Sequence, residues 1–211
     1  MSLPPYTIDT ATVLPAVAAI ALHVANYNAT ARLEFNSHAI TKVLGRNAVY
    51  FYAVYLVASA LVRDWFIDRA MAYDAGSLIL LPSGLAWLVG NALLVTGFGI
   101  NLWTLKALGI KNMYNGDSFG HLMDAPVNDG PYQLWNDPQY FGTSLACLGH
   151  AVALQSGVGY ALAAIMWCVF EVSVRNFEGP HLARIYANRD AVVAAARAAW
   201  GESDAKVAKT E

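Results

Sequence analysis

The sequence predicts an all-α fold: a polytopic helical membrane protein with four to five hydrophobic helices. Of its 211 residues, 57% are hydrophobic and only 13% are charged, and the mean hydropathy is +0.40. A soluble domain of this size carries roughly 25% charged residues, because its surface must face water. The apolar residues also gather in several long stretches, as in membrane-spanning helices. We therefore expect one integral-membrane domain over residues 1–211, with a core at 10–190 and a cytosolic tail at 191–211.

The composition also excludes several classes of partner. The net charge of −2 and the pI near 6.2 give no basic face for nucleic acid. The two cysteines, Cys147 and Cys168, lie in apolar stretches without a CxxC pattern, so we expect them to be reduced. The five histidines lack the spacing of a metal site, and the sequence therefore predicts no metal ion.

The first two apolar stretches are short. Residues 12–27 barely suffice for a crossing, so they fit either a tilted or a re-entrant helix. A polar segment, residues 28–47, separates this first stretch from the second. The second stretch, residues 48–62, is bounded by Arg63 and Asp64, and we expect a short acidic loop after it.

The remaining stretches are longer. Residues 83–105 can span with tilt, and Pro82 suits the start of their helix. Residues 106–139 are polar and rich in Gly, Pro, Asn and Asp, which predicts a long loop. Loops of this length are usually functional or disordered. The scattered aromatic residues of this loop favour an ordered, functional one. Residues 140–174 are too long for one crossing and contain a turn signal at 155–159, which predicts a tight helical hairpin.

Basic residues are distributed unevenly between the two sides of this arrangement. Eleven of the thirteen lysines and arginines follow the first, third and fifth stretches, whereas only Arg63 and Arg69 fall on the other side. The positive-inside tendency therefore places the long loop and the tail in the cytosol. Within the tail, residues 190–200 have the pattern of an amphipathic helix.

Ionisable residues near membrane helices are candidates for function because their burial in lipid is costly. Glu171, Arg175 and Glu178 are spaced by four and three residues, which places them on one helical stripe. An ion-paired helix end is the simpler explanation of that stripe. Asn28 and Arg32 are also four apart, and taken alone they suit an interfacial anchor at lipid phosphates.

The third stretch contains two glycines, Gly97 and Gly99, separated by Phe98. Small residues at such spacing usually allow close helix packing, and on spacing alone we favour that explanation. The functional alternative is the approach of a ligand to the bare backbone. His23 and His150 lie in apolar stretches, and we expect them to be hydrogen-bonded core residues rather than ligands.

Five short motifs stand in order along most of the chain. They are N-A-T-A-R-L-E at 28–34, G-F-G at 97–99, G-D-S-F-G at 116–120, N-D-P-Q-Y-F-G at 136–142 and F-E-G-P-H-L-A-R-I-Y at 177–186. Together they resemble the phospholipid N-methyltransferases, in particular the phosphatidylethanolamine N-methyltransferase branch. That family commonly has two acids before the proline near the end of the last helix, whereas here Glu178 is followed by Gly179.

The resemblance implies S-adenosylmethionine as methyl donor and a phospholipid of the bilayer as acceptor. The acceptor is phosphatidylethanolamine, or its mono- or dimethyl derivative, converted towards phosphatidylcholine. The resemblance also implies a location in the endoplasmic reticulum. The implied donor contacts are Gly97, Phe98, Gly99, Glu178 and Gly179.

The chemistry of methyl transfer suggests further roles. The amine must lose a proton, which makes Asp137 and Asp117 candidate acceptors of it. Tyr140 offers an aromatic face to the positive charge of the reacting groups. Arg32 suits the lipid phosphate, and the predicted substrate contacts are Asn28, Arg32, Glu34 and Trp135.

Three alternatives remain open from the residues. An enzyme of the isoprenylcysteine carboxyl methyltransferase type would be expected to carry Arg-His-Pro where this chain has Asn136-Asp137-Pro138. A transporter needs a polar path, yet the apolar stretches hold few polar residues at their centres. A non-catalytic membrane scaffold needs neither the G-D-S-F-G nor the N-D-P-Q-Y motif.

Overall fold

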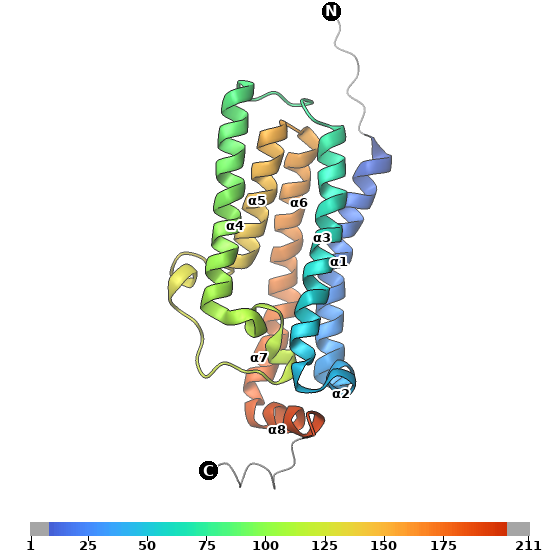
Figure 1. Cartoon of the computed structure of the whole chain (residues 1–211), viewed down its shortest axis with the longest axis vertical. Coiled ribbons are helices and arrows are strands. Elements are labelled where there is room, and N and C mark those ends of the chain that lie inside the picture. Colours follow the sequence, from blue (N-terminus) through green and yellow to red (C-terminus); the bar gives the residue numbers. More distant parts are fainter. Residues whose placement is uncertain (1–8, 202–211) are drawn as a thin grey trace, which may run out of the picture.

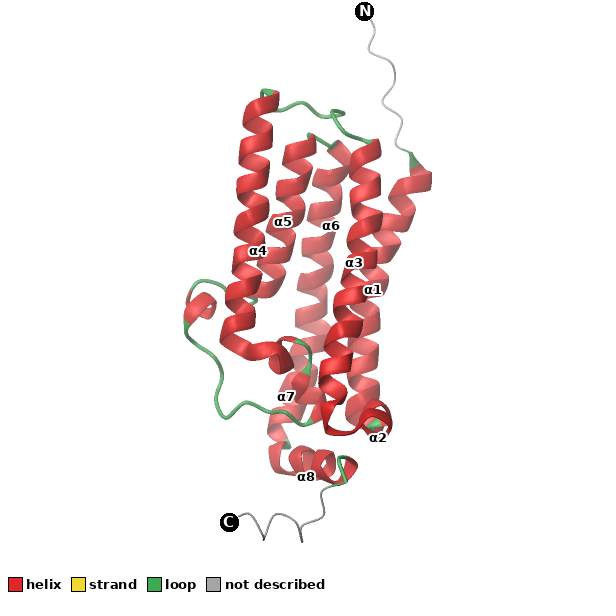
Figure 2. Ribbon diagram, in the orientation of Figure 1, coloured by secondary structure: helices red, strands yellow, loops and turns green. Residues whose placement is uncertain are grey.

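The computed structural model describes residues 9–201, and within that range the regular structure is entirely helical (Figure 2). Five long helices run side by side as an elongated bundle, and three short ones gather at one end of it (Figure 1). The long helices are α1 (Thr10–Ser37), α3 (Ala48–Tyr73), α4 (Ser83–Met113), α5 (Pro138–Leu154) and α6 (Gly157–Ser173). The short ones are α2 (Ala39–Leu44), α7 (Gly179–Ala187) and α8 (Arg189–Ala199). The predicted all-α class is confirmed.

Four segments of the described chain are long and apolar enough to cross a bilayer. They are Thr10–Ser37, Ala39–Tyr73, Ser83–Phe119 and Gly157–Ala187. The fifth long helix, α5, has 17 residues and lies between α4 and α6 in the bundle (Figure 1). The prediction of a polytopic membrane protein with four to five hydrophobic helices is therefore confirmed.

Two helices are longer than their apolar stretches. α1 continues through the polar segment to Ser37, because its polar side chains find partners in the bundle. Glu34, for example, is fully buried and accepts hydrogen bonds from the backbone N–H of Ile40 and from the Thr41 hydroxyl. α3 likewise passes through Arg63, which is buried inside the bundle, and the expected acidic loop directly after residue 64 is wrong.

The expected loop at 106–139 is also shorter than predicted. α4 extends to Met113, with a kink at Gly109, whose φ of 68° lies outside the helical region. Two short 3-10 helices, Gly116–Phe119 and Gly130–Gln133, order the rest of the connection. The helical hairpin is confirmed, since Gln155, directly after α5, adopts the left-handed conformation and the Ser156 hydroxyl caps α6.

Glycines bring α4 and α5 into backbone contact. A Cβ added to Gly97 would overlap the carbonyl oxygen of Gly142, and one added to Gly90 would overlap that of Gly149. The packing explanation is therefore correct for Gly97. Gly99, two residues later, has open space where a side chain would stand.

The end of α6 differs from the predicted stripe. A π-helical turn, Val174–Glu178, follows α6 and changes the direction of each side chain after it. Glu171 and Arg175 form the expected ion pair at 2.7 Å. Glu178 is turned away from them towards the bundle interior, so its predicted place on their stripe is wrong.

The predicted amphipathic helix is confirmed as α8. It buries Val192 and Ala196, and Ala196 lies against Gly120 of the long connection. Folded structure thus extends past the expected core boundary at residue 190. The last part of the expected tail, residues 202–211 with Lys206 and Lys209, lies outside the described residues.

Candidate active site

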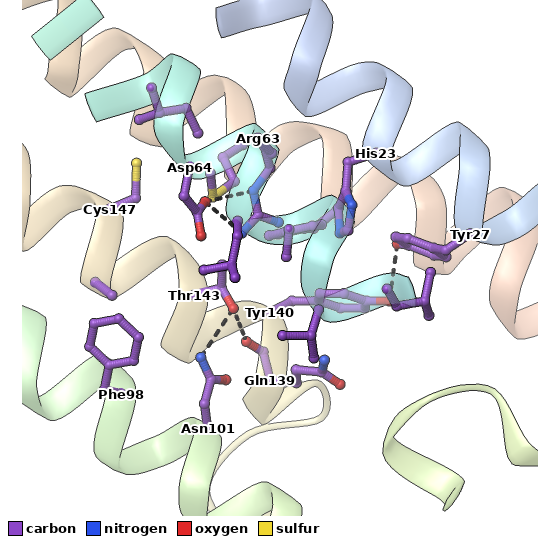
Figure 3. A pocket seen from close by; sticks show the side chains of 18 of the residues that line it. His23, Tyr27, Arg63, Asp64, Phe98, Asn101, Gln139, Tyr140, Thr143 and Cys147 are labelled. Atoms are coloured by element: carbon purple, nitrogen blue, oxygen red, sulfur yellow. Dashed lines mark hydrogen bonds and ion pairs between the residues drawn. The ribbon is translucent and has the colours of Figure 1, made fainter. Parts of the chain in front are cut away.

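A cavity of about 410 Å³ lies inside the bundle. α3 and α4 border it, and residues of α5 line it between them (Figure 3). Val57 and Leu61 of α3 and Phe98 of α4 are lining residues that are also exposed, so the cavity opens at the side of the bundle. Pockets of roughly 300–1,000 Å³ bind small molecules, and a side opening in a membrane protein faces the lipid.

A carboxylate network stands behind one wall of the cavity. Glu178 accepts hydrogen bonds from the hydroxyls of Tyr27, at 2.7 Å, of Tyr140 and of Ser173. Ser173 in turn accepts a hydrogen bond from the Asn28 amide at 2.8 Å. Because Tyr27 and Tyr140 line the cavity, Glu178 lies directly behind its surface. The network joins α1, α5 and the end of α6, and it explains why the polar end of α1 is helical.

Asp137, immediately before α5, is close to this network. It is half-buried, and no capping hydrogen bond from its side chain to the helix is present. Burial raises the pKa of the Asp137 carboxyl, and the nearby carboxylates of Glu178 and Glu171 raise that pKa further. A carboxyl group with a raised pKa is suited to accepting a proton during catalysis near neutral pH.

Four of the predicted site residues make contacts outside the cavity. The Asp117 carboxylate accepts a hydrogen bond from the Tyr186 hydroxyl at 2.6 Å. Trp135 stacks on Phe141, with ring centroids 4.8 Å apart. Glu34 holds the start of α2, as described above. Arg32 donates to the backbone carbonyl of Phe177 at 3.1 Å and lies over the Phe177 ring.

The cavity also contains polar residues that we did not predict as site residues. Arg63 pairs with Asp64 at 2.7 Å, and His150 pairs with Asp68 at 2.8 Å. Asn101 donates to the Thr143 hydroxyl at 3.2 Å. The sequence does carry a signal for the first pair. Apolar residues 65–67 follow the two charges directly, so the charges interrupt a hydrophobic helix rather than end it.

The two histidines in the apolar stretches are hydrogen-bonded, as predicted. His150 contacts Asp68, and Nδ1 of His23 lies 2.9 Å from the Ser59 hydroxyl. Both cysteines are free. Within residues 9–201, no group of three or more His, Cys, Asp or Glu side chains is arranged to hold a metal ion.

Comparison with known proteins gives consistent matches. The family model described as phospholipid methyltransferase matches residues 85–189. The chain is 52% identical to phosphatidylethanolamine N-methyltransferase B of Dictyostelium discoideum, over 82% of this chain and 87% of that protein. It is 33% identical to phosphatidyl-N-methylethanolamine N-methyltransferase of Saccharomyces cerevisiae, over 78% and 80%. It is 28% identical to human phosphatidylethanolamine N-methyltransferase, over 81% and 86%. No solved structure matches.

The helical bundle, its apolar spans and its internal cavity define a polytopic membrane protein with a site open towards lipid. The chain belongs to the phospholipid methyltransferase family, and it is therefore an enzyme that methylates phospholipid. The resemblance seen in the five sequence motifs is confirmed. The scaffold, transporter and isoprenylcysteine methyltransferase alternatives are left without support.

Proposed function

We propose that the chain transfers a methyl group from S-adenosylmethionine to the amine of phosphatidylethanolamine, or of its mono- or dimethyl derivative, towards phosphatidylcholine. The observation that carries this proposal is the cavity, which opens towards lipid at one side and has the Glu178 network behind another. The names of the relatives, which match over most of their length, support the same acceptor.

The residues beside the cavity fit a cationic methyl donor. When bound, S-adenosylmethionine supplies a methyl group already activated on a positively charged sulfur. Glu178 can bind the amino group or the ribose hydroxyls of the donor if one of the tyrosine hydroxyls gives up its hydrogen bond to the carboxylate. The rings of Phe98 and Tyr140 border the cavity, and an aromatic face attracts a cation by about 0.5–2 kcal/mol. Gly99 does not line the cavity, but its backbone is open to contact on the exposed side of α4, so a donor contact there stays a prediction. Donor contacts at Gly97 and Gly179 stay predictions.

The acceptor side needs a neutral amine held near the activated methyl group. We assign the removal of the amine proton to Asp137, because its pKa is raised and it lies close to the Glu178 carboxylate. The lipid tails pass through the side opening, so the substrate stays in the bilayer. Holding the two reactants in line then supplies much of the rate. Asn28, Arg32, Glu34 and Trp135 stay predicted substrate contacts, and Asp117 a second candidate base.

The orientation and location belong to the same proposal. The basic residues that follow the first, third and fifth apolar stretches include Arg32 of α1, Lys111 of α4 and Arg184 of α7, and the short helices α2, α7 and α8 gather at one end of the bundle (Figure 1). The positive-inside tendency places this end in the cytosol. Asp137 precedes α5 and Glu178 closes the π turn after α6, and we propose that a water-soluble donor enters there from the cytosolic side. The endoplasmic reticulum as the membrane is inferred from the family resemblance alone, and we treat residues 1–211 as a single domain.

The test is a methylation assay on the detergent-purified protein with radiolabelled S-adenosylmethionine and defined lipids. We expect label in phosphatidylethanolamine or in its mono- or dimethyl derivative, and none in phosphatidylglycerol, which has no amine. S-adenosylhomocysteine should also raise the melting temperature of the protein. The absence of label from all three amine-containing lipids would overturn the proposed function.

A further inference from the structure

An ion pair lies inside the bundle, and none of the contacts proposed above uses it. Nε and Nη2 of Arg63 donate hydrogen bonds to the carboxylate of Asp64 at 2.8 and 2.7 Å. The Arg63 side chain is only 6% exposed, whereas that of Asp64 is 53% exposed. Both residues line the cavity. Arg63 therefore lies in the protein interior, whereas the Asp64 carboxylate reaches the surface of the cavity.

The geometry of the pair leaves one oxygen open. Both hydrogen bonds from Arg63 reach the same atom, Oδ1 of Asp64. Among the described residues, Oδ2 of Asp64 has no hydrogen-bond partner. An arginine that only neutralises a carboxylate commonly uses both oxygens in a two-pronged pair. Here one oxygen is held and the other is free to bind a cation in the cavity.

The depth of the pair argues against a role at the protein surface. Asp64 lies nine residues before the end of α3 at Tyr73, which corresponds to about 14 Å along the helix. A charged group at such a depth in a membrane protein is costly, and it commonly marks the path or site of a ligand. The side opening beside Leu61 is one turn away on the same helix.

The pair also faces the proposed reaction centre. Figure 3 shows Arg63 and Asp64 on the side of α3 that faces Thr143 and Cys147 of α5. Tyr140 lies about one turn before Thr143, and Phe98 borders the same space from α4. A small cation at Asp64 would therefore lie near the aromatic rings assigned to the donor.

We propose that Asp64 binds the ammonium group of the lipid substrate and that Arg63 positions the Asp64 carboxylate for it. This inference rests on the proposed function, because it presupposes an amine-containing phospholipid in the cavity. The tails leave between α3 and α4, and Asp64 holds the head-group nitrogen in its protonated form, before the amine moves towards the donor side and loses its proton to Asp137. A site of this kind selects phospholipids with a cationic head group over those of the same shape without one.

The experiment measures lipid binding by isothermal titration of the detergent-solubilised protein without methyl donor. Two short-chain lipids are compared: phosphatidylethanolamine and its analogue with a hydroxyl group in place of the amine. We expect the wild type to bind the amine lipid about tenfold more tightly, as one charge-assisted hydrogen bond provides. Asp64→Asn should reduce this preference to nearly none.

A second variant is needed because Asp64→Asn leaves Arg63 buried without a carboxylate, which destabilises the fold. The double variant Arg63→Gln/Asp64→Asn removes both charges, and it should lose the preference as well. The control is Asp124→Asn, which breaks the exposed Asp124–Arg189 ion pair and should keep the preference. A melting-temperature increase with S-adenosylhomocysteine identifies the folded variants.

The outcomes separate this inference from the proposed function. If the wild type shows no preference, or if the folded Asp64 variants retain it, the assignment to Asp64 is wrong. In that case a wild type that still methylates phosphatidylethanolamine leaves the proposed function intact. If the wild type methylates no amine-containing lipid, the proposed function itself fails, whatever the binding data show.

Discussion

The hydroxyl of Tyr140 on α5 donates a hydrogen bond to Glu178, the last residue of the π turn after α6. Tyr27 of α1 donates to the other oxygen of the same carboxylate. One side chain therefore joins helices from both ends of the sequence and also stands behind the cavity. Because structure and proposed donor contact meet in one group, changes at Glu178 should affect stability and donor affinity together.

Replacing Glu178 tests this double role. Glu178→Gln removes the charge but keeps one oxygen acceptor for the hydroxyl groups. We expect the melting-temperature increase with S-adenosylhomocysteine to disappear and the unfolding free energy to fall by about 1–3 kcal/mol. The matched control, Glu171→Gln, changes a carboxylate paired with the exposed Arg175 and should keep the ligand effect. A Glu178→Gln protein that responds normally to the ligand would refute the donor contact.

The two glycines of the G-F-G motif should behave differently. Gly97→Ala places a methyl group onto the backbone of α5, so we expect a loss of about 1–3 kcal/mol in stability. Gly99→Ala meets open space and should leave the melting temperature unchanged or slightly higher. If the donor contacts the backbone at Gly99, the Gly99→Ala protein should nevertheless show a raised KM for S-adenosylmethionine. Equal melting temperatures of both variants would contradict the packing at Gly97.

Asp137 should give the enzyme a pH-dependent stability. Its folded-state pKa is raised above the ordinary value of 3.8 by burial and by the Glu178 and Glu171 carboxylates. The stability contribution of this group is present below its unfolded pKa and is lost as the pH rises through the raised folded pKa. Asp137→Asn should therefore melt higher than the wild type at pH 7, and the difference should shrink towards pH 4.

The same variant tests the catalytic assignment. Methylation should fall at least tenfold in Asp137→Asn, because the amine loses its proton acceptor. A gain in stability with a loss of activity is the pattern expected when an unfavourably placed charge serves catalysis. Melting curves and lipid labelling across the pH series measure the two effects separately. An active Asp137→Asn enzyme would refute the assignment to Asp137 and leave Asp117 as the candidate base.

The docking of α8 depends on the absence of a side chain at Gly120. This residue has a φ of 82°, and an added Cβ would overlap that of Ala196 in α8. Gly120→Ala should cost about 1–3 kcal/mol and release α8 for tryptic cleavage at Arg197. Gly84→Ala, which adds a methyl group in open space, serves as the control. Unchanged cleavage would show that α8 does not depend on this contact.

Much of the fold is predictable from hydrophobicity, but the ends of α1 and α3 are not. The sequence pattern breaks at Asn28 and at Arg63, because both are polar residues after an apolar run. α1 continues because Asn28 has a partner from a distant part of the chain, Ser173. α3 continues because Arg63 is paired with the adjacent carboxylate of Asp64. Helix periodicity contains no information about such partners.

The candidate site was predictable only where a motif marked it. Glu178 and Tyr140 belong to motifs that resemble those of the family, and the structure brings them together. Tyr27 belongs to no motif quoted above, and its place beside Glu178 depends on how α1 packs. From the sequence alone, Tyr27 cannot be distinguished from a tyrosine that lies at the membrane interface. The π turn that directs Glu178 inward leaves no sequence signal that we could use.

The close contact of α4 with α5 has a consequence for how lipid enters. Gly90 and Gly97 of α4 meet Gly149 and Gly142 of α5 in backbone contact, so we expect these two helices to move together. We then expect the opening beside Phe98 to widen by a shift of α3 relative to that pair. The enzyme thus has one rigid wall and one adjustable wall. The rate at which lipids exchange with the bilayer then becomes a property of α3 and of the residues that hold it in place.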